Sequence, residues 1–124
     1  MTASVKVDHE FNVSVERLWA EIGSFTKLDW TGDDPWEFDG NTRSLPAHGM
    51  KEELVSTGER SYTYRMLEGP FNNFSVTISA TGGAERSVAH YSAAGDLSAE
   101  EQGMVKEGTM EAFKALASRV SAQA

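Results

Sequence analysis

The most regular hydrophobic pattern in the chain lies near its N-terminal end. Over residues 5–13, apolar side chains alternate with charged or polar ones, as in a strand that is buried on one face. Ser14 then stands at the position of a helix N-cap, and the following apolar residues recur at helical spacing until Gly23. The pattern therefore predicts a strand over 5–13 and a short helix over 15–22.

The middle of the chain reads as a series of short strands. A second short helical segment, capped by Ser24, is expected before the break at Gly32 to Pro35. The segments beyond that break show strand-like alternation, and short links that contain Gly, Asn or Pro favour an antiparallel meander. The strands predicted there are 36–39, 42–45, 50–56, 61–68, 74–81 and 86–94.

The last quarter of the chain changes to a helical period. Ser98 and Glu101 fit a capping box, and the pattern beyond them predicts a helix of about 20 residues. Gly103 and Gly108 interrupt it, each at a cost of roughly 1 kcal/mol relative to alanine. Either a backbone or ligand approaches closely there, or the first half of the helix is irregular. One face of this helix is formed by Val105, Thr109, Phe113, Leu116 and Val120.

Composition limits the classes of function. The chain has 124 residues, a length typical of one domain, and 11 Lys and Arg against 19 Asp and Glu, a net charge of −8. This acidic balance argues against binding to nucleic acid or anionic lipid, because both depend on basic side chains that neutralise phosphates. The chain shows no apolar stretch of the kind that a membrane helix or secretory signal requires. We expect a single cytoplasmic domain, residues 1–124, without a nucleic-acid partner or membrane insertion.

Several kinds of reactive site lack their sequence signals. The chain contains no cysteine, which excludes disulfides, thiolate nucleophiles and cysteine-bound zinc. The histidines, His9, His48 and His90, stand on separate predicted elements without the short spacing of metal ligands. The sequence has neither the G-x-S-x-G motif of a serine nucleophile nor a glycine-rich phosphate loop. We therefore expect no metal and no cofactor.

Several local motifs, in their order along the chain, resemble those of a known superfamily. The motifs are Phe11-Asn12-Val13-Ser14-Val15-Glu16-Arg17-Leu18-Trp19, Ser24-Phe25 with Leu28 and Trp30, Gly40-x-x-Arg43-x-Leu45, Glu52-x-Leu54 and Tyr62-Thr63-Tyr64. The set is similar to the START-like, Bet v 1-like (SRPBCC) superfamily of helix-grip proteins. Within it, the motifs resemble the branch of polyketide cyclases, dehydrases and lipid-transport proteins.

The resemblance implies both a fold and a function. Helix-grip proteins fold an antiparallel sheet of about seven strands around a long C-terminal helix, and a cavity between the two holds a hydrophobic or amphipathic small molecule. The fold class implied here is α+β, with two short helices after the first strand. The implied function of this START-like domain is binding of such a molecule, as a carrier or a sensor.

Strand parity indicates which side chains would line such a cavity. Residues of one parity on the predicted strands face inward, and a few positions of the C-terminal helix face them. The composition of this set is typical of small-molecule pockets, but the same residues would equally fill a dry core. The candidate ligand-binding residues are Arg43, Leu45, Glu52, Leu54, Tyr62, Tyr64, Met66, Phe74, Val76, Val88, His90, Met104 and Gly108.

The charged and titratable members of this set are the most informative. Arg43 and Glu52, on neighbouring predicted strands, can form a bidentate pair that serves either as a structural strut or as an anchor for a ligand oxygen. His90, on the predicted inward parity, carries an imidazole suited to acid–base chemistry. Glu52, Tyr64 and His90 are the candidate catalytic residues if the domain is an enzyme.

Three functions remain open at this point. Binding of a small hydrophobic molecule is favoured, because no constellation of polar residues demands catalysis. An enzyme of the polyketide cyclase or dehydratase kind would use the same cavity. A protein-interaction module would need no small ligand at all. The sequence is compatible with a monomer and with a homodimer.

Overall fold

Seven strands and two α-helices make up the described part of the chain, residues 2–26 and 35–122 of the computed structural model. The helices are α1 (Val15–Ile22) and α2 (Ala99–Ala122), and a 3₁₀ turn, η2, spans Pro46–His48. The strands are β1 (Ala3–Phe11), β2 (Glu37–Asp39), β3 (Thr42–Leu45), β4 (Met50–Gly58), β5 (Ser61–Glu68), β6 (Asn72–Gly82) and β7 (Ser87–Asp96).

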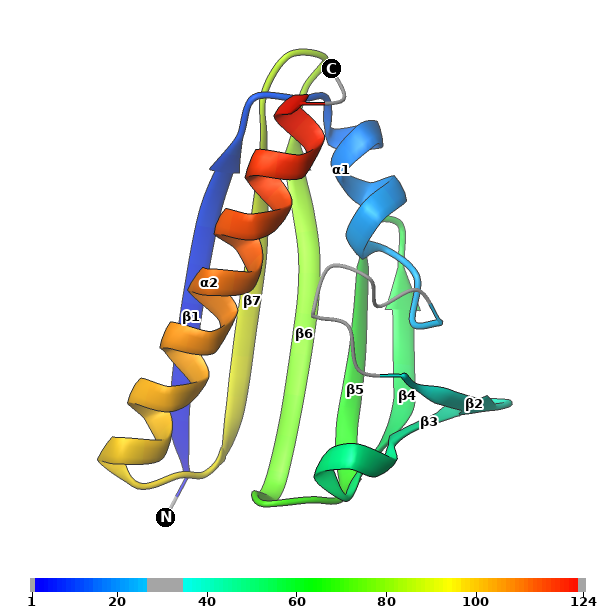
Figure 1. The fold of residues 1–124 in the computed structure, drawn as a ribbon, viewed down its shortest axis with the longest axis vertical. Coiled ribbons are helices and arrows are strands. Elements are labelled where there is room, and N and C mark those ends of the chain that lie inside the picture. The colour runs from blue at the N-terminus through cyan, green and yellow to red at the C-terminus, as the bar shows by residue number, and fades with distance from the viewer. Residues whose placement is uncertain (1, 27–34, 123–124) are drawn as a thin grey trace.

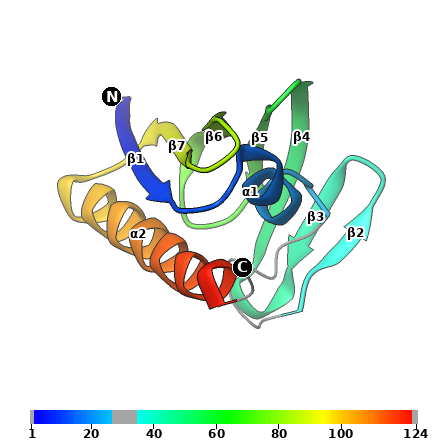
Figure 2. The same ribbon diagram turned by 90° about the horizontal axis from the view of Figure 1, so that it is seen from above.

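The strands form one antiparallel sheet in the order β1-β7-β6-β5-β4-β3-β2. Helix α2 lies across one face of this sheet (Figure 1). Seen from above, the sheet curves so that α2 lies in its concavity (Figure 2). We call this concave side the inner face. The chain therefore has the α+β helix-grip fold that its motifs imply.

Helix α1 begins and ends where the sequence predicts, at Val15–Ile22. The Ser14 hydroxyl accepts a hydrogen bond from the backbone N–H of Arg17 at 3.0 Å, as expected of an N-cap. The predicted strands are confirmed as well, with ends that differ by a few residues. The second short helical segment predicted after Ser24 falls largely on 27–34, outside the described residues.

The main core lies between the inner face and the C-terminal half of α2. Phe113, Leu116 and Val120 on the predicted helix face are 0%, 1% and 0% exposed. The Phe113 ring meets the Phe11 ring of β1 edge to face, with 6.2 Å between centroids. Full burial of each such side chain contributes about 1.5–3 kcal/mol, which is enough to hold the helix against the sheet.

The start of α2 is fixed by the predicted capping box. The Ser98 hydroxyl accepts a hydrogen bond from the backbone N–H of Glu101 at 3.1 Å, and the Ser98 N–H donates to the Glu101 carboxylate at 2.9 Å. This reciprocal pair supports a helical half that has little core packing. Neither helix of the described chain is long and apolar enough to cross a membrane.

The N-terminal half of α2 corrects two predictions. Gly103 and Gly108 face open space, where an added Cβ would meet no atom within 4 Å, and the helix runs without a break. Neither a close backbone approach nor an irregular helix accompanies them. Met104 is 60% exposed. Met104 and Gly108 therefore do not line a cavity, because they stand about 140° and about 100° around the helix from the centre of the buried face.

Strand β7 corrects the predicted parity. Val88 and His90 do not face inward; Ala89 and Tyr91 take the inner positions instead. The pairing with β1 explains the difference, because the inward Val7 lies directly opposite Tyr91 and opposed residues share a face. Apolar side chains stand on both parities of β7, with Val88 on one and Ala89 and Tyr91 on the other, so the register with β1 decides which of them faces inward.

Candidate functional site

The inner face of β3, β4 and β5 brings together four polar side chains, which we call the polar cluster: Arg43, Glu52, Tyr62 and Tyr64. Arg43 lies directly opposite Glu52 in the β3–β4 ladder, and the two tyrosines occupy alternate positions on β5. The four residues are 2%, 3%, 3% and 7% exposed, in that order. Polar groups buried to this extent are normally hydrogen-bonded to other protein groups, to ordered water or to a ligand.

Arg43 is held from several sides. Its Nε donates a hydrogen bond to Glu52 Oε1 at 2.8 Å, and its Nη1 donates to the carbonyl oxygen of Phe25 at 2.8 Å. The guanidinium carbon lies 4.2 Å from the centre of the Phe25 ring and 4.5 Å from that of Tyr64, distances at which a ring attracts a cation. Arg43 thus ties β3 to β4 and to the segment after α1, as the strut, one of the two predicted roles, would. The second guanidinium bond goes to Phe25 and not to Glu52, so the pair is not the bidentate one expected.

Burial governs the electrostatics of the polar cluster. It raises the pKa of the Glu52 carboxyl, although the charge and hydrogen bond of Arg43 oppose the rise. Burial also raises the pKa of the Tyr62 phenol, against the opposing effect of Arg43. The pKa of Tyr64 is raised well above its ordinary value by burial, to which Tyr91 and Glu52 add. Both hydroxyls of the cluster stay protonated at neutral pH and keep a proton to donate.

The Tyr62 hydroxyl is buried without a hydrogen-bond partner among the described residues. The rings of Trp19 and Phe25 lie 6.2 Å and 6.3 Å from the Tyr62 ring, centroid to centroid. Arg43 is near enough for its charge to act on the hydroxyl, but no hydrogen bond of ordinary geometry joins them. A buried hydroxyl left unpaired costs about 1–3 kcal/mol, so this one calls for a partner that the described chain does not supply.

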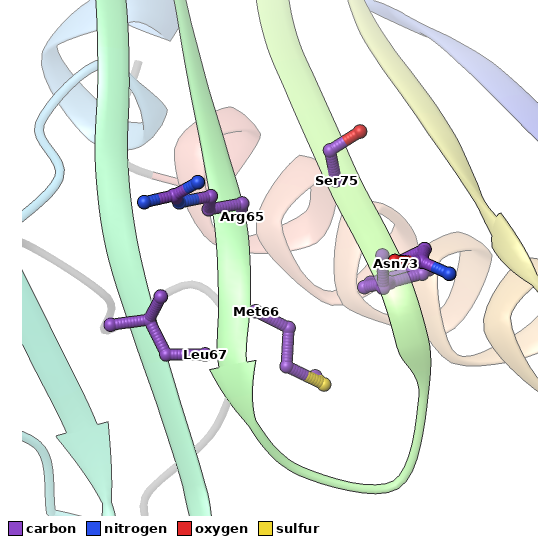
Figure 3. Close-up of a pocket in the computed structure, with 6 residues that line it drawn as sticks. Arg65, Met66, Leu67, Asn73 and Ser75 are labelled. Carbon is purple, nitrogen blue, oxygen red and sulfur yellow. The ribbon is translucent and has the colours of Figure 1, made fainter.

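A pocket of about 500 Å³ opens where β5 and β6 part. Pairing between these strands ends at Arg65 and Ser75, and the β6–β7 pairing is irregular in the adjoining stretch. Asn73 there has a positive φ of 53°. The Met66 side chain lies in the gap between the two strands (Figure 3). The lining residues are Arg65, Met66, Leu67, Asn73, Phe74 and Ser75.

Most of the predicted ligand-binding residues lie on the inner face, in the polar cluster, at the pocket or in the core between them. Sequence reasoning missed the carbonyl and ring of Phe25, which hold Arg43, and the inward ring of Tyr91. The pairing of β7 with β1 indicates that the Tyr91 ring faces inward. The predicted residues on the inner face are Arg43, Leu45, Glu52, Leu54, Tyr62, Tyr64, Met66, Phe74 and Val76. Those found elsewhere are Val88, His90, Met104 and Gly108.

His90 belongs to a separate network on the outer face of the sheet. Its Nδ1 lies 2.6 Å from Asp8 Oδ1 and its Nε2 lies 2.8 Å from Thr81 Oγ1, so the imidazole links β1, β7 and β6. This placement removes His90 from the polar cluster and from any acid–base role there. Across residues 2–26 and 35–122, no group of three or more His, Asp or Glu side chains is placed to hold a metal ion.

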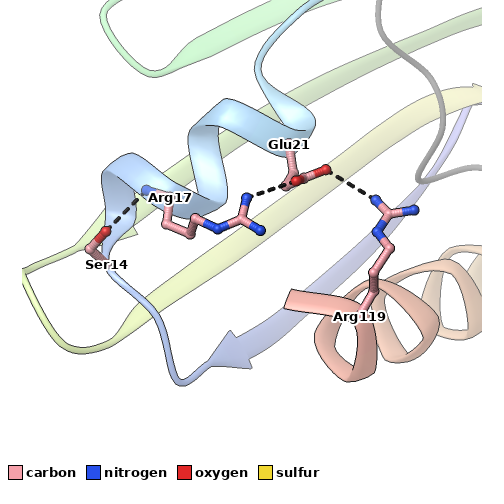
Figure 4. Close-up of polar contacts among 4 residues, drawn as sticks. All are labelled: Ser14, Arg17, Glu21 and Arg119. Carbon is pink, nitrogen blue, oxygen red and sulfur yellow. Dashed lines mark hydrogen bonds and ion pairs between the residues drawn. The ribbon is translucent and has the colours of Figure 1, made fainter. Parts of the chain in front are cut away.

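A second buried carboxylate joins the two helices. Glu21 on α1 accepts hydrogen bonds from Arg17 Nη1 at 2.7 Å and from Arg119 Nη2 on α2 at 3.0 Å (Figure 4). The Glu21 side chain is 11% exposed, whereas those of Arg17 and Arg119 are 34% and 38% exposed. This tie fixes the C-terminal end of α2 against α1.

A curved antiparallel sheet that holds a long C-terminal helix over a buried polar cluster defines a helix-grip protein. No protein-family model and no curated protein sequence matches the chain. Among solved structures, an uncharacterised protein from Bacillus thuringiensis has a TM-score of 0.82 at 26% identity, over 94% of this chain and 98% of that one. The protein XoxI from Bacillus cereus also has a TM-score of 0.82 at 26% identity, over 94% of each chain.

Norcoclaurine synthase from Thalictrum flavum is a more distant neighbour. Its complex with dopamine and hydroxybenzaldehyde has a TM-score of 0.71 at 16% identity, over 99% of this chain and 88% of that one. At that identity the similarity shows a common fold. The fold is that of the START-like, Bet v 1-like superfamily, which confirms the superfamily resemblance of the sequence motifs.

Proposed function

We propose that the protein binds a small hydrophobic or amphipathic molecule between the inner face of the sheet and α2, as a carrier or a sensor. The observation that carries this proposal is the buried Tyr62 hydroxyl, which has no partner among the described residues. A bound molecule that accepts its hydrogen bond would remove the cost of leaving the hydroxyl unpaired.

The surroundings of Tyr62 support a ligand of this class. The rings of Trp19, Phe25 and Tyr64 provide apolar contact area, and the Arg43–Glu52 pair adds a few fixed polar groups, which is the usual composition of a ligand site.

The pocket between β5 and β6 supports a route to that site. Two of its lining residues, Met66 and Phe74, lie on the inner face, with Met66 two residues beyond Tyr64 on β5, whereas Arg65, Leu67 and Ser75 lie on the outer face. Its volume of about 500 Å³ falls within the usual range for small-molecule sites, about 300–1,000 Å³.

The neighbouring structures favour a small aromatic or otherwise apolar ligand. Norcoclaurine synthase holds dopamine and hydroxybenzaldehyde, so a protein of this fold accommodates small aromatic molecules. We extend to this chain only the class of ligand, because function depends on the residues of a site and not on the fold that carries it.

A second candidate function is an enzyme of the polyketide cyclase or dehydratase kind that uses the same site. The observation that favours it is the raised pKa of Glu52, because a carboxyl that transfers protons near neutral pH needs such a shift. Tyr64 is the second candidate of the polar cluster, and because its pKa is raised well above the ordinary value it would hold its proton and donate a hydrogen bond to a substrate. Membership of the branch of polyketide cyclases and lipid-transport proteins is part of this proposal.

The proposal treats residues 1–124 as one domain that acts in the cytoplasm as a monomer or a homodimer. Its partner is a small hydrophobic ligand, with no nucleic acid and no membrane insertion. The alternative without a ligand is a protein-interaction module, and the same experiment separates the two.

Native mass spectrometry of the purified protein, followed by denaturing extraction, tests the proposal. We expect a mass excess that disappears on unfolding, and a stoichiometric lipophilic compound in the extract. Tyr62→Phe keeps the ring but removes the hydroxyl, so it should retain less of the compound. Thr63→Val removes a hydroxyl from the opposite face of the same strand, where Thr63 bonds to Thr77 at 2.8 Å, and should retain as much as the wild type.

The outcomes of this experiment are distinct. Turnover of the extracted compound by the protein would favour the enzyme over the carrier. If the protein is empty and the neutral naphthalene dye prodan shows no saturable binding, the proposal is wrong and a protein-interaction module becomes the leading function.

A further inference from the structure

We infer that the site selects uncharged ligands over carboxylates, because the cation of the polar cluster is already neutralised by a glutamate of the same cluster. The inference rests on the proposed function and adds to it the charge and the anchoring group of the ligand. The ligand that fits is a mostly apolar molecule with an uncharged acceptor oxygen, such as a ketone or an amide.

Arg43 has little to offer an incoming anion. Nε and Nη1 already donate to Glu52 and to the Phe25 carbonyl, and the guanidinium lies over the rings of Phe25 and Tyr64. The Arg43 side chain is only 2% exposed. A ligand carboxylate that bonded to Nε would have to displace Glu52, and one that bonded to the remaining N–H groups would still meet the negative charge of Glu52 beside it.

The charge balance of the cluster also opposes a second carboxylate. The Glu52 side chain is 4% exposed and lies 2.8 Å from Arg43, so one buried anion is matched to one buried cation. A ligand carboxylate would give up its hydration and meet the repulsion of Glu52, and neither cost is offset by a free cation in the cluster. An amide or ketone oxygen gives up far less hydration on entering the same place.

Tyr62 supplies the complementary group for an uncharged ligand. Its hydroxyl is buried and has no partner in the described chain. Because burial raises the pKa of this phenol, the hydroxyl keeps its proton and acts as a neutral donor. A neutral donor pairs with a carbonyl oxygen without bringing a net charge into the site.

Two matched probes test the inference. 1-Naphthaleneacetamide and 1-naphthaleneacetate share one carbon skeleton and differ in charge at about pH 8, where an ordinary carboxyl is ionised. Each would be titrated against bound prodan, followed by the fluorescence of the dye. We expect the wild-type protein to bind the amide at least about tenfold more tightly than the acetate, a difference of about 1.4 kcal/mol.

The decisive variant is Glu52→Gln. Any apolar pocket prefers an amide to a carboxylate, but only the proposed charge balance depends on Glu52. The variant leaves Arg43 unneutralised, so the acetate should gain affinity and the ratio of amide to acetate affinity should fall about tenfold or more. Glu10→Gln removes an outer-face carboxylate that is 66% exposed and 3.8 Å from Arg86, and it should leave the ratio unchanged.

The wild-type protein offers a second test that needs no variant. The Glu52 carboxyl faces Arg43 from β3, Tyr62 and Tyr64 from β5, and Tyr91 from β7. Among these groups only the Glu52 carboxyl, whose pKa is raised by burial, can gain a proton as the pH falls from about 8 toward about 6, where an ordinary carboxyl stays ionised. Because protonation of Glu52 frees the charge of Arg43, the affinity for the acetate should rise across that range.

The outcomes separate the inference from the proposed function. Similar affinity of the wild type for the two probes overturns the inference but not the proposed function. The same holds if neither Glu52→Gln nor acid pH changes the ratio of amide to acetate affinity. Failure of the dye and of both probes to bind overturns the proposed function and the inference together. Circular dichroism of each variant confirms that the fold is retained.

Discussion

Two buried glutamates, Glu52 and Glu21, each accept hydrogen bonds from arginine, but they lie in different surroundings. The side chains of Glu52 and Arg43 are 4% and 2% exposed. The Glu21 side chain is 11% exposed, and its partners Arg17 and Arg119 are 34% and 38% exposed. Water reaches both arginines between the helices, whereas the pair on the inner face is shielded from it.

The difference separates a structural tie from a pair that sets the electrostatics of a site. If Glu21 is lost, its arginines turn toward solvent and their charges are hydrated. If one member of the Arg43–Glu52 pair is lost, the other remains buried beside Tyr62 and Tyr64 without compensation. The Arg43–Glu52 pair therefore sets the electrostatic potential at the proposed ligand site. The hydrogen bonds of Glu21 to Arg17 and Arg119 hold α2 in place against α1.

The largest effect is expected for Arg43→Met. The substitution leaves the Glu52 carboxyl buried without its cation and removes the hydrogen bond to the Phe25 carbonyl. Breaking a buried pair in this way costs about 3–5 kcal/mol of the free energy of unfolding. Urea denaturation followed by circular dichroism measures the change. The double variant R43M/E52M, which removes both charges, should recover most of the loss, and a double variant as unstable as the single one would contradict this account.

Most of the elements that position the Arg43–Glu52 pair could be predicted from the sequence. Helix α1 and the inward parity of β3, β4, β5 and β6 could be predicted, because each is recorded in the local alternation of apolar and polar residues. The parity of β7 could not be read from β7 alone. Ala89 and Tyr91 take their face from the ladder with β1, which is a contact between distant segments.

The contacts that define the site were harder to predict for the same reason. The partners of Arg43 include a backbone carbonyl 18 residues away, and Arg119 reaches Glu21 across 98 residues. A backbone acceptor leaves no mark in the side-chain pattern. The exposed Gly103 and Gly108 gave a false signal, because a glycine in a helix looks the same in sequence whether it meets a neighbour or open space.

A smaller effect is expected for Glu21→Gln. The neutral side chain keeps an acceptor oxygen for Arg17 or Arg119 but loses the charge that strengthens both hydrogen bonds. Because both arginines are partly exposed, the loss should be about 1 kcal/mol, measured by the same urea denaturation. Glu16→Gln serves as the control, since Glu16 is 69% exposed and lies 3.3 Å from Arg60, and its stability should match the wild type. A loss as large as that of Arg43→Met would erase the distinction between the two glutamates.

The pH dependence of stability should separate Glu52 from its glutamine variant. Burial raises the pKa of Glu52 in the folded state above its ordinary value of 4.5. At a pH between these two pKa values, the folded chain keeps the Glu52 proton, whereas the unfolded chain has already released it. Stability contributed by this group is therefore lost as pH rises through that window. Glu52→Gln lacks the effect, so the variant should gain stability relative to the wild type as pH rises from about 4 to about 8. Parallel curves for the two proteins would show that burial does not dominate the environment of Glu52.

The smallest effect is the response to salt. Raising the ionic strength from about 0.1 M to about 1 M shortens the screening length from about 10 Å to about 3 Å. Salt ions reach the partly exposed arginines around Glu21. The loss of unfolding free energy caused by Glu21→Gln should therefore shrink by a few tenths of a kcal/mol, about the contribution of a partly exposed ion pair. The cost of Arg43→Met should stay the same, because ions cannot enter between Arg43 and Glu52 without opening the polar cluster. Equal shrinkage in the two variants would mean that solvent reaches both carboxylates, and the inner pair could then no longer hold a fixed charge balance against an incoming carboxylate.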